Sequence, residues 1–524
     1  MVSDLTRRSA VLAGFSAAGL VLSARAATPR PSPVAATQHG RVRGYVDDGV
    51  LAFRGVRYGA DTAARRFQPP APPAPWKGVV DAQAYGPASP QRDRNAGAVS
   101  EDCLFLNVWT PALRDGARRP VMVYIHGGAY SNGSGSSPLY DGVRLCKRGD
   151  VVVVTVNHRL NAFGYAYLPR LLPALADSGN VGQLDLILAL AWVRDNIAEF
   201  GGDPANVMVF GQSGGGAKIA TMMATPAAAG LFHRAATMSG QQVTASGPGN
   251  AHRRTLAWLD GLKLKPEQAA DLLALPVDRL VEGLGVEDPV LGFGGLYFGP
   301  VLDERSLQRH PFYPDAPAQS AHIPMIIGNT HDETRAFLGG DPKNFALGWD
   351  DLPGKLTQAN MRVDIRPETV IAEYRRLYPA YSPSEVFFSA TTAARSWRAA
   401  IIEAEERARA GTPAYAYQLD FPAAGDRLRA PHASDIQLVF DNLAKPGATA
   451  SGPRGQQMAD QMSEAFIAFA RTGDPNCKAV PRWEPYAVPR RQTMVFDIPS
   501  RLVDDPRGGE RRLFGKVPFV QAGT

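Results

Sequence analysis

Cysteine is scarce in this 524-residue chain, which contains only Cys103, Cys146 and Cys477. Three cysteines allow one intramolecular disulfide at most, so the fold is not a small scaffold stapled by disulfides. The sequence does not decide whether any of the three pair. Metal-binding patterns are missing too: there is no His-Glu-x-x-His, no Cys-x-x-Cys and no ligand cluster at helical spacing. We therefore expect neither a metal nor another cofactor.

Clusters of basic residues are also absent. The 56 lysines and arginines exceed the 50 aspartates and glutamates, but they form no run and no stripe interleaved with aromatic residues. Nucleic acid is therefore not an expected partner. Glycine-rich segments such as Gly133–Gly135 lack the following Lys-Ser/Thr of a P-loop, so phosphate binding is not indicated either.

The apolar stretch Ala10–Leu22 is too short, and too rich in glycine and alanine, for a stable membrane span. It follows Arg7-Arg8 and precedes Ala24-Arg25-Ala26, the order found in a twin-arginine signal peptide cleaved after Ala26. Removal of residues 1–26 would lower the formal charge from +6 to +4. We expect residues 27–524 to be periplasmic or secreted; a fortuitous start on a cytosolic protein is the alternative.

Dense apolar runs bounded by turn residues are typical of strands covered on both faces. Such runs occur at Phe105–Trp109, Val121–Ile125, Val151–Val156, Val207–Phe210, Ile323–Gly328, Tyr415–Leu419 and Thr493–Phe496, the last being the final expected strand. Helical patterns lie between them at Tyr140–Arg148, Leu184–Phe200 and Met458–Arg471. This alternation predicts an α/β fold with a mostly parallel central sheet flanked by helices.

Two largely helical segments, Pro248–Gly294 and Asp341–Arg407, read as insertions over the carboxyl edge of the sheet, where pockets of α/β proteins lie. We expect both to build the pocket. Nearby aromatic residues could line it, although packing in the core is favoured for each of Phe293, Tyr297, Phe298 and Trp397. A small antiparallel hairpin is expected from Gly40–Tyr45 and Val50–Tyr58. Without an internal repeat or a flexible linker, residues 27–524 are expected to form a single domain.

The segment Val207–Lys218 contains Gly211-Gln212-Ser213-Gly214-Gly215 between an apolar strand and a segment suited to a helix. A G-x-S-x-G sequence in this context is typical of a strained turn that lifts the serine hydroxyl clear of the sheet. It also puts Ser213 at a helix N-terminus, where negative charge is favoured. Ser213 is therefore the candidate nucleophile, against the alternative of an ordinary serine in a glycine-rich turn.

A serine nucleophile needs a base, a group that orients the base, and donors for the oxyanion. His126-Gly127-Gly128-Ala129 directly follows the strand Val121–Ile125, and its glycines let backbone N–H groups turn toward the site. In the α/β-hydrolase arrangement these groups act with the N–H of the residue after the nucleophile, here Gly214.

The chain order nucleophile, acid, base selects His432, which lies in the loop after the strand Tyr415–Leu419. The earlier histidines come too soon after Ser213 or precede or share the loop of the acid; they are His233, His252, His310, His322 and His331. Asp332 and Glu333 both follow the strand Ile323–Gly328. Spacing alone does not choose between these two carboxylates.

From about Gly40 to Phe496 the chain resembles the type-B carboxylesterases, the carboxylesterase and cholinesterase branch of the α/β-hydrolases. Besides the segments above, the resemblance rests on Phe53-Arg54-Gly55-Val56-Arg57-Tyr58, Ser100-Glu101-Asp102-Cys103-Leu104-Phe105-Leu106-Asn107-Val108, Asn157-His158-Arg159-Leu160, Phe200-Gly201-Gly202-Asp203-Pro204 and Gly473-Asp474-Pro475-Asn476. With its signal peptide, the chain resembles a bacterial exported member.

The resemblance implies an α/β-hydrolase fold and assigns roles that spacing leaves open. It makes Glu333 the acid of a Ser213-Glu333-His432 triad. It assigns the oxyanion donors to the N–H groups of Gly128, Ala129 and Gly214. Supporting positions around these groups are Gly127, Gln212, Ser239 and Asp435.

Four positions depart from the family pattern. Ser89 stands where the cysteine that pairs with Cys103 is expected, which agrees with folding before export. Gln212 replaces the common glutamate before the nucleophile, which removes a negative charge and should disfavour cationic, choline-like substrates. Thr334 and Leu186 replace a usual glycine and a usual glutamine, changes that look tolerable.

These features predict a serine hydrolase that cleaves a small-molecule carboxylic ester through an acyl-enzyme. Hydrolysis of a carbamate or an activated amide by the same groups is the alternative. A non-catalytic, cholinesterase-like binding protein is a more distant one, because here every catalytic position is filled. The acyl and alcohol parts of the ester, and the oligomeric state, are left open by the sequence.

Overall fold

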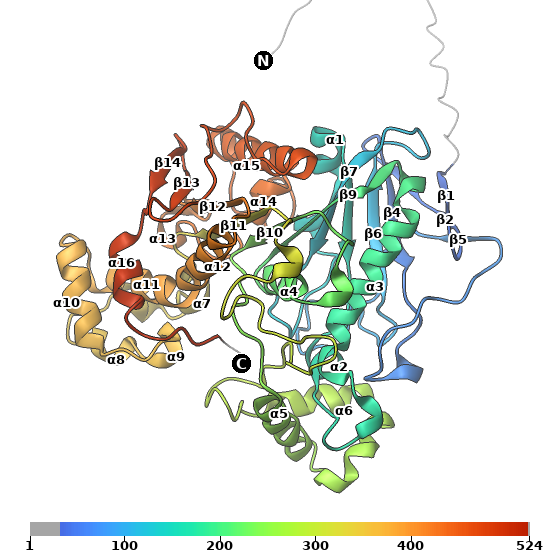
Figure 1. Ribbon diagram of the computed structural model, residues 1–524, viewed down its shortest axis with the longest axis horizontal. Coiled ribbons are helices and arrows are strands. Elements are labelled where there is room, and N and C mark those ends of the chain that lie inside the picture. Colours follow the sequence, from blue (N-terminus) through green and yellow to red (C-terminus); the bar gives the residue numbers. More distant parts are fainter. Residues whose placement is uncertain (1–31, 522–524) are drawn as a thin grey trace, which may run out of the picture. The chain divides into compact units, whose positions relative to one another are not determined.

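The computed structural model describes residues 32–521, and the segment expected to be a signal peptide lies outside this range. From Pro33 onward the chain forms one compact unit. An eleven-stranded sheet runs through it in the order β14-β13-β12-β11-β10-β9-β7-β8-β6-β4-β3, and β1, β2 and β5 form a small separate sheet (Figure 1). The pairs from β8 through β7 and β9 to β13 are parallel. The predicted α/β-hydrolase fold, with its mostly parallel sheet flanked by helices, is confirmed.

The strands occupy short apolar stretches, as the sequence indicates. Their bounds are β1 Val34–Thr37, β2 Gly40–Arg43, β3 Tyr45–Asp47, β4 Val50–Arg57, β5 Val79–Asp81, β6 Phe105–Thr110, β7 Arg119–Ile125, β8 Val152–Val156, β9 Gly202–Gln212, β10 Arg234–Met238, β11 Met325–Thr330, β12 Ala414–Leu419, β13 Gln492–Phe496 and β14 Arg501–Asp504.

The helices connect these strands or belong to the insertions. They are α1 Val143–Gly149, α2 Asn161–Tyr165, α3 Val181–Asn196, α4 Gly214–Met223, α5 Pro248–Gly261, α6 Val277–Glu282, α7 Arg335–Leu338, α8 Leu352–Lys355, α9 Gln358–Met361, α10 Pro367–Leu377, α11 Pro383–Thr392, α12 Arg398–Arg409, α13 Gly425–Leu428, α14 Ile436–Val439, α15 Gly452–Thr472 and α16 Gly508–Phe514. A π-helical segment, Ala393–Trp397, joins α11 to α12. Within the described residues, no helix is long and apolar enough to cross a membrane.

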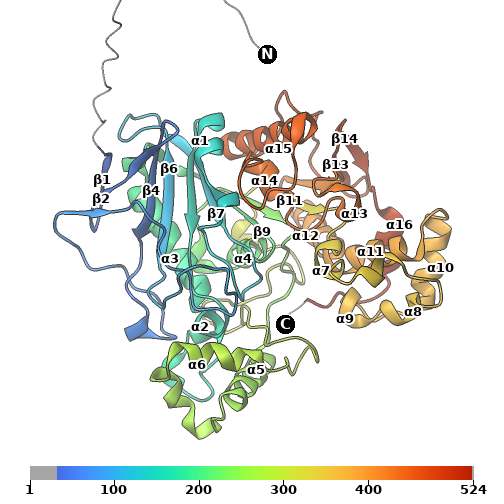
Figure 2. The same ribbon diagram turned by 180° about the vertical axis from the view of Figure 1, so that it is seen from behind.

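The two faces of the sheet bury alternate residues of the same strands. In β7, Val121, Val123 and Ile125 pack in one core, whereas Met122 and Tyr124 pack in the other. Helices α3, α4 and α12 contribute to the first core, and α1, α14 and α15 to the second (Figure 2). Because both faces are covered, the central strands have apolar residues on both sides, which explains the dense runs in the sequence.

Two local predictions at the sheet edges are wrong. The expected N-terminal hairpin divides between two sheets: β2 pairs with β1 and β5, while β3 pairs with β4. The turn between β3 and β4 consists of Asp48 and Gly49, whose φ values of 46° and 82° suit a two-residue hairpin turn. The strand at Thr493–Phe496 is not the last one either, because β14 pairs antiparallel with it. β14 is an edge strand and has no apolar run.

The two insertions are helical, as predicted, but they form separate clusters (Figure 1). The segment with α5 and α6 packs through Trp258 and Leu259 against Phe163 of α2. The segment with α8, α9, α10 and α11 has its own apolar cluster, which includes Leu513 and Phe514 of α16. The C-terminal helix therefore anchors to the second insertion.

Candidate functional site

Four neighbouring parallel strands, β9, β10, β11 and β12, end at the same edge of the sheet. Each is followed within a few residues by one polar site residue: Ser213 after β9, Ser239 after β10 and Glu333 after β11, with His432 in the longer loop after β12. Because carboxyl ends of parallel strands meet at one edge, Ser213 and His432, 219 positions apart in the sequence, reach the same cavity. The sheet thus brings together the three residues that the sequence singles out as a triad.

The turn that carries Ser213 has a strained backbone, with φ of 57° and ψ of −128° at the serine. The Ser213 N–H donates to the carbonyl oxygen of Met238, 2.8 Å away, which ties the turn to the end of β10. A Cβ on Gly214 would lie 2.0 Å from the Ala129 carbonyl oxygen. The absence of that side chain lets the loop after β7 approach the turn.

Glu333, rather than Asp332, faces His432. The Nδ1–H of His432 donates to Oε2 of the fully buried Glu333. Burial alone would raise the pKa of Glu333, but the charge and hydrogen bond of His432, with hydrogen bonds from Ser239 and the Thr330 N–H, hold it below its ordinary value. Glu333 is therefore an ionised group buried behind the imidazole.

Asp332 points to other partners. Its Oδ1 accepts from the Arg335 guanidinium at 2.9 Å, and its Oδ2 lies 3.1 Å from Nδ1 of His331. This neighbouring carboxylate is thus already used in an ion pair of its own. Of the two carboxylates that spacing left open, Glu333 is the one that hydrogen-bonds to His432.

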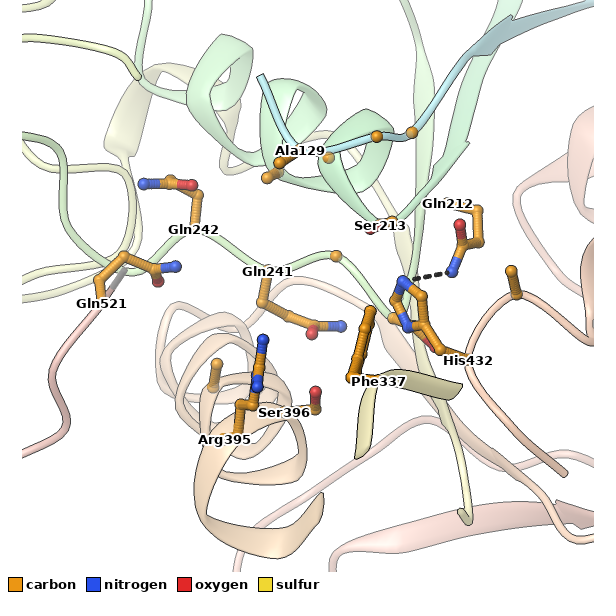
Figure 3. Close-up of a pocket in the computed structure, with 18 of the residues that line it drawn as sticks. Ala129, Gln212, Ser213, Gln241, Gln242, Phe337, Arg395, Ser396, His432 and Gln521 are labelled. Atoms are coloured by element: carbon orange, nitrogen blue, oxygen red, sulfur yellow. Dashed lines mark hydrogen bonds between the residues drawn. The ribbon is translucent and has the colours of Figure 1, made fainter. Parts of the chain in front are cut away.

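The other nitrogen of His432 contacts the residue before the nucleophile. With the Nδ1 proton facing Glu333, Nε2 has a free lone pair, and Nε2 of Gln212 donates to it across 3.1 Å (Figure 3). Within the described residues, no hydrogen bond joins the Ser213 hydroxyl to His432. The Nε2 lone pair of His432 is therefore engaged by the Gln212 amide.

The loop after β7 holds the backbone groups expected to bind an oxyanion. Gly128 and Ala129 have φ values of 87° and 51°, and the Gly128 carbonyl accepts from the N–H groups of Ser131 and Asn132, each at 3.1 Å. At Gly127, a Cβ would lie 2.8 Å from the Gln212 carbonyl oxygen. Close packing against the serine turn therefore fixes this loop.

A lysine that the sequence reading missed fastens the same loop. Lys218 is fully buried in α4, and its Nζ donates to the carbonyl oxygens of Ala129, at 2.7 Å, and His126, at 3.3 Å. Nζ also lies 5.2 Å from the centre of the Tyr130 ring. Burial lowers the pKa of Lys218 to about 7. The sequence did contain a signal for Lys218, which lies five residues after Ser213 in the expected helix. Helical side chains lean toward the helix N-terminus, so this side chain is directed back toward the serine turn.

Ser239 and Asp435 lie behind the triad residues. The Ser239 hydroxyl accepts from the Thr330 N–H at 3.3 Å and hydrogen-bonds to Glu333. Asp435 is fully buried and accepts from the Tyr417 hydroxyl at 2.7 Å. Burial raises the pKa of Asp435 to about 6, and the nearby charge of Glu333 adds to the increase.

Ser213 opens into a cavity of about 670 Å³. The second insertion contributes Arg362, Arg395, Ser396 and Ala399 to its lining, as predicted. The prediction that Pro248–Gly294 also builds it is wrong, because that segment packs against α2 instead. Three further sets of lining residues had no local sequence signal; they are Gln241 with Gln242, Phe337, and Phe519 with Val520 and Gln521.

Of the four aromatic residues considered for the pocket, Tyr297 lines the cavity, whereas Phe298 and Trp397 are buried in cores. Phe293 lies against the Arg362 guanidinium, 4.6 Å from its ring centre. In the described part of the chain, no group of three or more His, Cys, Asp or Glu side chains is arranged to hold a metal ion.

The carboxylesterase family profile matches residues 31–508. The chain belongs to the carboxylesterase family. It is a carboxylic-ester hydrolase, and among its relatives is the para-nitrobenzyl esterase of Bacillus subtilis, 34% identical over 91% of this chain and 98% of that protein. The phenmedipham hydrolase of Pseudarthrobacter oxydans is 34% identical over 91% of this chain and 96% of that protein. A solved carboxylesterase of Geobacillus stearothermophilus superposes with a TM-score of 0.81, at 37% identity, covering 92% of this chain and 99% of that one.

The departures of this carboxylesterase from the family pattern fit their surroundings. The Ser89 hydroxyl accepts from the Leu160 N–H at 3.1 Å, and Cys103 is buried and unpaired. The Thr334 hydroxyl lies 2.8 Å from that of Thr391, and Leu186 is buried in the core. The hydroxyl groups that Ser89 and Thr334 bring to these positions therefore both have hydrogen-bond partners.

Proposed function

We propose that this esterase cleaves small-molecule carboxylic esters through an acyl-enzyme on Ser213, with His432 as base and Glu333 as the group that orients it. The observation that carries the proposal is the His432–Glu333 hydrogen bond, directly behind a serine on a strained turn. The ionised, buried Glu333 favours the tautomer with the proton on Nδ1. That tautomer leaves Nε2 free to act as a base.

In the first half of the reaction, Ser213 Oγ attacks the ester carbonyl carbon while His432 Nε2 accepts the hydroxyl proton. The carbonyl oxygen becomes an oxyanion, which the N–H groups of Gly128, Ala129 and Gly214 stabilise. His432 then gives its proton to the alcohol oxygen, the bond between carbonyl carbon and that oxygen breaks, and the acyl group remains on Ser213. Water repeats these steps and releases the acid.

The contact between Gln212 and His432 adds one requirement. Before attack, the Gln212 amide has to leave Nε2 so that the serine hydroxyl can donate there. Once Nε2 is protonated, rotation of the same amide would present its oxygen to the imidazolium as an acceptor. Gln212 can thus serve both protonation states of His432 without carrying a charge.

The proposal is tested by intact-protein mass after reaction with a fluorophosphonate. We expect one adduct on the wild-type protein and none on Ser213→Ala. Ser396→Ala is the matched control, because it removes another serine hydroxyl of the same cavity and should keep the adduct. Absence of an adduct on well-folded wild-type protein would overturn the proposal and favour a binding protein. If the wild-type adduct forms, fresh unlabelled enzyme is then assayed on matched esters, carbamates and amides, of which the esters should be cleaved fastest.

We also propose that the protein is exported, on the strength of Arg7-Arg8 and the segment that follows them. Esterase activity in the periplasmic or culture fraction should disappear when both arginines are replaced by lysine, and should accumulate in the cytoplasm instead. Activity that stays cytoplasmic in the wild type would contradict this proposal without affecting the catalytic one.

A further inference from the structure

The cavity next to Ser213 contains two arginines, Arg362 and Arg395. Among the described residues that line it there is no aspartate or glutamate. Neither arginine forms an ion pair within the described chain. A guanidinium removed from water without a carboxylate is costly, so such groups are normally paired. The two partly buried guanidinium groups are therefore left without a carboxylate partner on the cavity wall.

Arg395 lies one aromatic ring away from the catalytic imidazole. Its guanidinium is 4.9 Å from the centre of the Phe337 ring, and that ring is 4.7 Å from the ring of His432. Figure 3 shows Phe337 between the two side chains, with Arg395 in the cavity. The π-helical segment Ala393–Trp397 holds Arg395 there, and such irregular turns are frequent at functional sites. Ser213 and this guanidinium thus line the same cavity.

Arg362 comes from a different element. It follows α9 with a positive φ of 61°, and its guanidinium lies against the ring of Phe293. The Nε and Nη1 atoms are buried without a hydrogen-bond acceptor among the described residues. Burial, and then the charge of Arg395, lowers the pKa of Arg362 to about 10, so it still carries a positive charge at neutral pH. Two like charges near each other add to the need for an anion.

We propose that Arg362 and Arg395 form a carboxylate-binding subsite, so that the preferred substrate is an ester that also carries a free carboxylate. This inference rests on the proposed function of Ser213. A carboxylate suits the subsite because guanidinium groups bind it through paired, charge-assisted hydrogen bonds. Its two oxygens can also accept from both arginines at once.

Matched neutral and anionic esters test this subsite. On the acyl side, mono-4-nitrobenzyl glutarate is compared with 4-nitrobenzyl valerate, which has a similar chain without the charge. On the alcohol side, 4-(butyryloxymethyl)benzoate is compared with its methyl ester. Hydrolysis is followed by chromatography of the released alcohols. We expect kcat/KM to be about 10- to 100-fold higher for the anionic member of at least one pair, the range given by charged hydrogen bonds. The preference should shrink at high salt.

The variants Arg395→Gln and Arg362→Gln should lower kcat/KM for the anionic ester far more than for the neutral one, so that most of that preference is lost. Arg375→Gln is the matched control, since Arg375 is an exposed arginine of the same insertion that lies over Trp349 and does not line the cavity. It should change neither rate. No preference for either anionic ester, or a preference that both cavity variants retain, would overturn the subsite. Continued cleavage of the neutral esters would then leave the proposed esterase function standing.

Discussion

Lys218 is the side chain that most directly holds the loop after β7, whose N–H groups we propose to bind the oxyanion. Its ammonium group donates to Ala129 and His126, the carbonyl groups on either side of the segment that carries the Gly128 and Ala129 N–H groups. No other described side chain donates to either of these two oxygens. We therefore treat Lys218 as a positioning residue that holds the N–H groups in place without touching the substrate.

Lys218→Met keeps the length and apolar stem of the side chain but removes the donor. We expect kcat to fall about 10- to 100-fold with a small change in KM, somewhat less than the loss of one oxyanion donor. Binding of a trifluoromethyl ketone, which forms the tetrahedral oxyanion, should weaken by the same factor. A merely structural lysine would lower the melting temperature without this selective loss. Lys147→Met, which breaks an exposed ion pair with Asp48, is the control.

Gln212 places a neutral amide, rather than a charged group, against Nε2 of His432. In Gln212→Glu a carboxylate would face Nε2 of His432 and favour the imidazolium, which cannot accept the serine proton. The acid limb of the kcat/KM profile should therefore move to higher pH by about one pH unit. Gln212→Met removes the contact without adding charge and should leave that limb in place. A profile that is the same in all three proteins would contradict this role.

At the scale of elements, helix α12 carries a buried acid that the reaction does not use. Glu403 is fully buried, and its Oε1 accepts from the Gln242 N–H at 2.8 Å. Burial raises the pKa of Glu403 to about 8. Gln242 lines the cavity, so Glu403 of α12 holds one segment of the cavity wall by a hydrogen bond to its backbone.

Glu403 should make stability fall as the pH rises. Its folded pKa of about 8 lies above the ordinary value of 4.5, so the folded state binds the proton more tightly. The contribution of Glu403 to the free energy of unfolding is therefore at its full value below pH 4.5. It is lost as the pH rises toward 8, where the buried carboxyl ionises. Glu403→Gln should raise the melting temperature by about 2–5 °C at pH 9 and change it little at pH 5. Glu406→Gln, which removes a partly exposed carboxylate of α12 that pairs with Arg409, should show no such dependence.

Element types were predicted well where a local pattern determines them. The central strands are apolar because both sheet faces are covered, and α15 has a clear buried face. Edge elements were harder: β14 is recognisable only through its pairing with β13. The division of the N-terminal strands between two sheets depends likewise on their partners, which periodicity does not reveal.

At the scale of the whole molecule, the candidate site also contains some residues that a local pattern predicts and others that only tertiary packing brings in. Ser213, His432 and the Asp332-Glu333 pair follow directly from strand ends and short motifs in the sequence. Arg362, Arg395 and the C-terminal residues carry no such signal, because α9, the π-helical segment and the chain end reach the cavity only through tertiary packing. The groups expected to perform chemistry are locally encoded, whereas the groups that surround the substrate are assembled from distant segments.

The C-terminal segment is the most distant of these. After α16, which anchors through the buried Leu513 and Phe514, the chain returns to the middle of the molecule (Figure 1). There Phe519 and Val520 line the cavity, and Oε1 of Gln521 accepts from the Val243 N–H at 3.0 Å. One wall of the substrate cavity is therefore formed by a segment that contributes little to the core.

Deletion of residues 518–524 should open this wall without unfolding the protein, because α16 and its contacts remain. We expect KM for neutral esters to rise about 3- to 10-fold through the lost apolar contacts of Phe519 and Val520, with kcat within about twofold. The melting temperature should stay nearly constant. Gln521→Ala, which removes the hydrogen bond to Val243 but keeps Phe519 and Val520 in place, separates that bond from the apolar wall and should have the smaller effect. An unchanged KM in the truncated enzyme would show that esters bind without this wall, against the other residues of the cavity.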